Sequence, residues 1–98
     1  MKNKDGKFFF EYYRKKNKNL KGVVMAIDRG IIGWSMCDPK DQFSKHEALR
    51  IAFERAKKSH RLFNEGSDEK LVEYYSKIPR SMIDLAIKIL KRSEAYYK

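Results

Sequence analysis

The chain of 98 residues carries a formal net charge of +10, and 42% of its residues are hydrophobic while 37% are charged. This density of apolar and aromatic side chains excludes a disordered polymer and suits one small domain over residues 1–98. The longest apolar runs are too short for a secretory signal or a membrane span, and the single cysteine is typical of a reducing cytoplasm. We therefore expect a cytoplasmic protein with no membrane partner.

Three strands are predicted after a flexible basic N-terminus at residues 1–6. The aromatic segment at 7–16 is the first, and its alternation gives two rows: Phe8, Phe10 and Tyr12 on one face, with Phe9, Glu11 and Tyr13 on the other. The apolar segment at 23–27 is typical of a central, covered strand. A tight turn at 28–30 leads to a third strand at 31–37, which completes an antiparallel meander.

Helices are predicted for the remainder of the chain. Ser44 and Glu47 have the spacing of a capping box, followed by an apolar stripe with a basic opposite side. A second helix begins at Ser67, and Pro79 separates it from a third. Strands followed by helices predict an α+β fold: a small three-stranded antiparallel sheet with three helices packed on one face.

The segment CDPKDQFSKHE at 37–47 gathers the chemically reactive side chains. Asp38, Asp41 and Glu47 could form a metal-dependent nuclease site, or Cys37 and His46 a nucleophile and base. A structural role explains more of these residues, because aspartate and proline favour turns and acids favour helix N-termini. We predict a strand-to-helix connection with no catalytic residues, no metal and no cofactor, and hence no enzyme.

The positive charge is concentrated in two places. Residues 1–22 hold eight lysines and arginines against two acids, and residues 44–63 hold six against two. Aromatic side chains that stack on bases, flanked by cations that bind phosphates, are typical of single-strand and RNA recognition. The predicted nucleic-acid-binding residues are Arg14, Lys15, Lys16, Lys18, Lys21, Tyr12, Tyr13, Arg50, Lys57, Lys58 and Arg61. Tyr12, Tyr13 or Phe9 would stack on bases if exposed.

Residues 33–56, GWSMCDPKDQFSKHEALRIAFERA, resemble a block in small accessory proteins of large tailed phages. That block has a C-x-P-K-D-x-F-x-K pattern and an apolar helix ending in R-A; the matching residues are Cys37, Pro39, Lys40, Asp41, Phe43, Lys45, Arg55 and Ala56. Residues 77–93 also resemble the closing helix of these proteins. The resemblance implies a phage origin and a non-enzymatic binding role in the host cytoplasm, in some relatives against host defence proteins such as toxin ribonucleases.

Two functions remain open at this point. The first is a small basic phage-type protein that binds nucleic acid, with RNA or single strands preferred, through the aromatic-basic strand. The alternative is an inhibitor that binds an acidic surface on a host defence protein such as a toxin ribonuclease, with RNA as a bridge between the two. An exposed first strand would also allow a homodimer, although charge along a strand edge discourages pairing.

Overall fold

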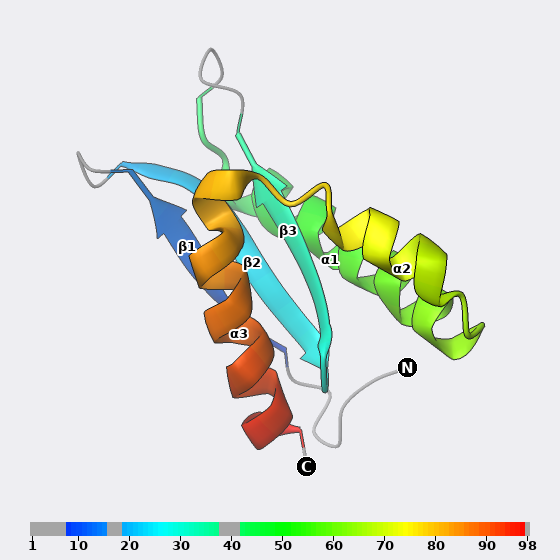
Figure 1. The fold of residues 1–98 in the computed structure, drawn as a ribbon. Helices are drawn as coiled ribbons and strands as arrows, with labels where there is room; N and C mark the ends of the chain where they lie inside the picture. Colours follow the sequence, from blue (N-terminus) through cyan, green and yellow to red (C-terminus); the bar gives the residue numbers. More distant parts are fainter. Residues whose placement is uncertain (1–7, 16–18, 38–41, 98) are drawn as a thin grey trace.

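The structure is a computed structural model of the chain, and it describes residues 8–15, 19–37 and 42–97. Three antiparallel strands come first, in the spatial order β1-β2-β3 (Figure 1); they are β1 (Phe9–Arg14), β2 (Leu20–Asp28) and β3 (Ile31–Met36). Gly30 adopts a φ of 71° in the turn between β2 and β3, which glycine tolerates without steric cost.

Helical elements follow the sheet; they are α1 (Lys45–Asn64), α2 (Asp68–Tyr75), the short 3-10 helix η1 (Arg80–Met82) and α3 (Ile83–Tyr96). The α+β class, with three strands followed by three helices, is confirmed. Ser44 caps α1 as predicted, since its Oγ accepts a hydrogen bond from the Glu47 N–H at 3.2 Å. None of the described helices is long and apolar enough to cross a membrane.

The helices divide between the two faces of the sheet, so the expected packing on one face is wrong in that detail. Figure 1 shows α3 in front of the sheet and α1 behind it, and we call these sides the front and back faces. Val23, Met25 and Ile27 of β2 belong to the core beside α1, whereas Val24 and Ala26 belong to the core beside α3. A strand that is apolar on both sides buries both rows only when both faces are covered.

The back face is held at close range by small residues. Ala48, Ala52 and Ala56 are buried in α1, and they lie over β2 and β3. A Cβ atom at Gly33 would collide with the Ala52 carbonyl oxygen and the Ala56 backbone nitrogen. The absence of a side chain at Gly33 therefore sets how closely α1 approaches the sheet.

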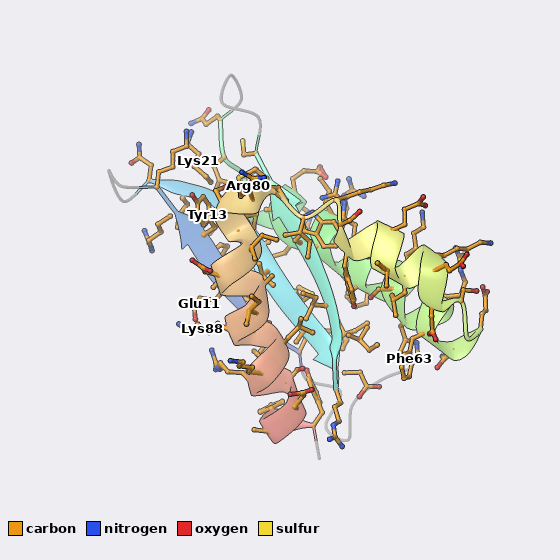
Figure 2. The ribbon with its side chains drawn as sticks, viewed as in Figure 1. Glu11, Tyr13, Lys21, Phe63, Arg80 and Lys88 are labelled. Carbon is orange, nitrogen blue, oxygen red and sulfur yellow. The ribbon has the colours of Figure 1, made fainter. Side chains whose placement is uncertain are left out.

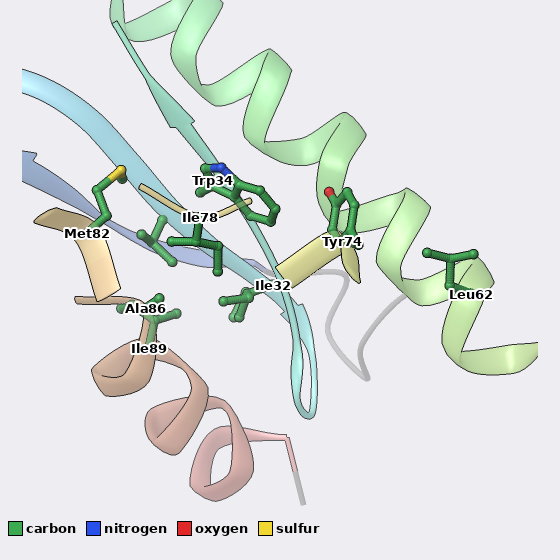
Figure 3. Close-up of a cluster of buried hydrophobic side chains, with 10 residues drawn as sticks. Ile32, Trp34, Leu62, Tyr74, Ile78, Met82, Ala86 and Ile89 are labelled. Atoms are coloured by element: carbon green, nitrogen blue, oxygen red, sulfur yellow. The ribbon is translucent and has the colours of Figure 1, made fainter. Parts of the chain in front are cut away.

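The front face carries the larger core (Figure 3). Its buried side chains come from β2, β3, α1, α2, η1 and α3, and the rings of Trp34 and Tyr74 lie 4.9 Å apart. The Tyr74 hydroxyl donates a hydrogen bond to the Arg55 carbonyl of α1. Burial raises the pKa of Tyr74 well above its ordinary value, because the phenolate would lose its hydration.

Candidate nucleic-acid interface

The row of β1 on the back face is the first part of the candidate site, and we call Phe8, Phe10 and Tyr12 the aromatic row. The ring centroids of Phe8 and Phe53 of α1 lie 5.2 Å apart, and those of Tyr12 and Phe43 lie 6.1 Å apart. Phe10 lies between these two anchored rings and remains 42% exposed. The alternation of β1 predicted this row correctly, and α1 leaves its middle member open to solvent.

Two lysines of α1 lie beside the aromatic row. The Lys45 ammonium is 5.5 Å from the Tyr12 ring centroid, and the Lys57 ammonium is 4.9 Å from the Phe53 ring centroid. Both distances are within the range of cation–π attraction. The back-face side of β1 therefore combines exposed aromatic surface with positive charge.

The other row of β1 packs under α3 on the front face. The Phe9 ring contacts those of Tyr96 and Tyr97, and Tyr13 packs against the front core. The Glu11 carboxylate accepts a hydrogen bond from Lys88 Nζ at 3.0 Å and also pairs with Arg92 at 3.5 Å. Contacts with α3 thus occupy Phe9 and restrict Tyr13, whereas Phe10 is open.

Cations gather at the end of the sheet where β1 meets β2. Figure 2 shows Lys21 of β2 and Arg80 of η1 at this end of the sheet. Met82 of η1 packs close to Gly22 of β2, which brings η1 to the same end. Among the described residues, the side chains of Lys15, Lys21 and Arg80 form no ion pair with a carboxylate. We call these three residues the hairpin cations. Lys16 and Lys18, predicted for the same role, lie outside the described residues.

The predicted cations of α1 are mostly paired within the helix. The charged nitrogen and the carboxylate oxygen lie 2.5 Å apart in the pair of Arg50 with Glu47 and 3.2 Å apart in the pair of Lys57 with Glu54. The same distance is 3.9 Å between Arg61 and Glu65. These exposed pairs are weak, yet each acid offsets the local potential that a phosphate would meet. The sequence showed the cations of this helix but did not predict their pairing.

Lys58 differs from the other cations of α1 because it turns toward α2. Its ammonium lies 5.9 Å from the Tyr74 ring centroid, and it lines a small surface cleft with Lys70 and Lys77. Glu73 lines the same cleft. Lys58 also lines a second surface hollow together with Glu54, Lys57 and Arg61, so it lies between the Lys57 side of α1 and the side that faces α2.

The segment at 37–47 lies partly outside the described residues, since residues 38–41 are not described. Cys37 lines a shallow pocket of β3 and α1 together with Ser44 and Glu47, and Ser44 is engaged as the helix cap. Within residues 8–15, 19–37 and 42–97, no group of three histidine, cysteine or acidic side chains could hold a metal ion. That the protein has no catalytic activity stays a prediction.

Three residues of the candidate site were missed by sequence reasoning, namely Phe10, Lys45 and Arg80. Alternation places Phe10 in the same row as Tyr12, but only the position of α1 decides which ring is left uncovered. Lys45 and Arg80 reach the site from helices that follow β1 by more than thirty residues. No local pattern signals such contacts.

Fold and surface together define a small basic α+β protein with an aromatic and cationic surface along one edge of its sheet. No family model, no curated protein and no solved structure matches this chain. The similarity to accessory proteins of large tailed phages stays a prediction.

Proposed function

We propose that the protein binds single-stranded nucleic acid, with RNA preferred, along the back-face side of β1, without catalysing a reaction. Phe10 would stack on a base, with Tyr12 beside it, and Arg14 with the hairpin cations would contact phosphates. The observation that carries the proposal is the 42% exposure of Phe10 beside two anchored aromatic rings, one of which, Tyr12, has the Lys45 ammonium over it.

A single strand suits this surface better than a duplex. Bases of a single strand can be splayed onto aromatic rings, and every base has a face that can stack. Alternate residues of β1 place Phe10, Tyr12 and Arg14 at intervals of roughly 6.6 Å along one row. A linear track of this kind follows a strand backbone and gives little sequence preference.

Fluorescence anisotropy with a labelled single-stranded RNA would test the proposal, using protein freed of copurifying nucleic acid. Phe10→Ala should weaken binding by about 5- to 150-fold, the effect of losing about 1–3 kcal/mol of base stacking. Phe63→Ala is the matched control, because Phe63 is 58% exposed at the far end of α1 (Figure 2). Its affinity should equal that of the wild type.

Equal losses in both variants would contradict a stacking role for Phe10. Failure of the wild-type protein to bind RNA or single-stranded DNA at low salt would sink the proposal as a whole. That result would turn attention to the alternative, a host defence protein with an acidic surface as the partner. A single-stranded DNA of the same sequence, measured in parallel, would test the preference for RNA.

A further inference from the structure

The two outer edges of the sheet differ in how their backbone groups are satisfied. At β3, Arg55 Nη1 donates to the Trp34 carbonyl at 2.9 Å, and Ser59 Oγ donates to the Ile32 carbonyl at 3.1 Å. The Tyr75 hydroxyl accepts from the Ile32 N–H at 3.5 Å. Side chains of α1 and α2 therefore seal this edge against pairing with another strand.

Among the residues that the structure describes, no side chain covers the edge of β1 in this way. The Lys15 N–H donates to the Asn19 carbonyl at 3.1 Å, so the odd-numbered residues of β1 direct their backbone groups toward β2. The register of the sheet agrees. The backbone carbonyl of Trp34 points outward from β3, so its partner Val24 directs its own backbone groups toward β1. Val24 is paired with Glu11, so the backbone groups of Glu11 point toward β2.

Phe10 and Tyr12 consequently direct their backbone N–H and C=O groups away from the sheet. Among the described residues, no group makes a hydrogen bond to these four atoms. Figure 1 shows β1 at the outer side of the sheet, with α3 in front of it. An edge with unpaired backbone groups and an exposed Phe10 is a template for another strand.

We propose that two copies of the chain pair through β1, antiparallel and around a two-fold axis, to form one continuous six-stranded sheet. A two-fold axis matches this edge with itself, since each copy offers the same outward donors and acceptors at the same spacing. The sealed edge of β3 stops further addition of strands, so pairing ends at the dimer.

The charges on β1 select the register. Pairing centred on Glu11 would place two carboxylates directly opposite each other, which is destabilising. Pairing centred on Tyr12 instead places Arg14 beside Phe10 of the second copy and Glu11 beside Tyr13 of the second copy. The two aromatic rows then meet on the back face as one surface.

Salt dependence separates this association from nucleic-acid binding. Each copy carries a formal charge of +10, and Lys88 and Arg92 lie next to β1 in both copies. Added salt screens the repulsion between copies, so dimerisation should strengthen as ionic strength rises. Binding to nucleic acid weakens with salt because counterions are released, and the two processes therefore respond in opposite directions.

Sedimentation equilibrium of nucleic-acid-free protein, combined with amide hydrogen exchange, would test the pairing. In the dimer the amides of Phe10 and Tyr12 should be as protected as those of Glu11 and Tyr13, and dilution should remove only the protection of Phe10 and Tyr12. A monomer at high micromolar concentration would overturn the proposal. So would a dimer in which Phe10 and Tyr12 exchange rapidly, and so would protection of these amides in a monomer.

Two variants make the test specific to the edge. Tyr12→Pro removes an outward N–H that the monomer does not use, so it should abolish the dimer, whereas Tyr12→Phe should retain it. A folded Tyr12→Pro protein that still dimerises would overturn the assignment to β1. If Tyr12→Pro fails to fold, the exchange pattern of the wild type decides the question by itself. Neither measurement contains nucleic acid, so failure here leaves the proposed function untouched.

Discussion

Gly33 shows how one missing side chain fixes the spacing between a strand and a helix. Its position in β3 faces Ala52 and Ala56, and the backbone of α1 fills the space that a Cβ would need. Gly30 is a useful contrast, since it is required for its φ of 71° while no atom lies within 4 Å of a Cβ built there.

Gly33→Ala should lower the free energy of unfolding, and the decrease should be near the upper end of the range of about 1–3 kcal/mol, because two backbones must separate to admit the methyl group. Gly30→Ala should cost roughly 1 kcal/mol, the expense of a left-handed conformation alone. Urea denaturation followed by circular dichroism would measure both. A smaller loss for Gly33→Ala than for Gly30→Ala would contradict the packing described for α1.

Tyr74 links stability to alkaline pH. Its pKa is raised above the ordinary value of 10.0 because burial disfavours the phenolate. A tyrosine with a raised pKa in the folded state contributes its full stability below about pH 10, and this contribution falls as the pH rises beyond that value.

Urea denaturation at pH 9 and pH 11 would check this linkage in the wild type and in Tyr74→Phe. The wild type should lose stability over this interval by up to about 1.4 kcal/mol per pH unit more than the variant, since phenylalanine has no proton to release. Equal slopes for the two proteins would show that Tyr74 does not ionise on unfolding in this range.

At the scale of elements, the start of α1 rests on one side-chain bond that α2 lacks. Ser44 accepts from the Glu47 N–H, whereas Ser67, at the corresponding position of α2, makes no side-chain cap bond. Ser44→Ala should therefore destabilise the protein by about 1 kcal/mol, and Ser67→Ala by less. Thermal denaturation of the two variants would show the difference, and equal effects would argue against the cap at Ser44.

Local patterns predicted the elements well and their packing only in part. Alternation in β1 and the spacing of Ser44 and Glu47 depend on neighbouring residues, so sequence reasoning found the strand rows and the first cap. The pairing of Glu11 with Lys88 joins residues far apart in the chain. The division of helices between two faces likewise depends on contacts that no short segment encodes, although the two-sided apolar character of β2 already indicated a covered strand.

The candidate site was predictable by composition but not by exposure. Sequence reasoning selected Tyr12 and Tyr13 for stacking, and the structure places them half-buried on opposite faces of the sheet. Phe10, two residues from Tyr12, is the exposed ring because α1 covers β2 and β3 but not the middle of β1. Which ring a helix covers depends on the whole fold, so the sequence could not show which member of the aromatic row is the most exposed.

At the scale of the molecule, the formal charge of +10 matters most where it is unpaired. For a single strand, each phosphate contact contributes about −0.7 to the slope of log affinity against log salt. Lys21→Gln should therefore reduce the magnitude of this slope by about 0.7, because Lys21 is one of the hairpin cations. Arg50→Gln is the matched control, since Arg50 is already bound to Glu47.

Anisotropy titrations at several salt concentrations would give the slopes for wild type, Lys21→Gln and Arg50→Gln. The slope of Arg50→Gln should stay near that of the wild type. A larger change for Arg50→Gln than for Lys21→Gln would place the phosphates on α1 and away from the end of the sheet.

The two-sided sheet has a consequence for synthesis on the ribosome. Translation delivers the three strands first, at about 5–20 residues per second, while the helices that cover them are still being made. β2 is apolar on both sides, and its front row is buried only when η1 and α3, the last elements of the fold, have emerged. The nascent strands therefore cannot reach their final burial until α3 has left the exit tunnel, so the sheet waits for a helix made more than fifty residues after β2.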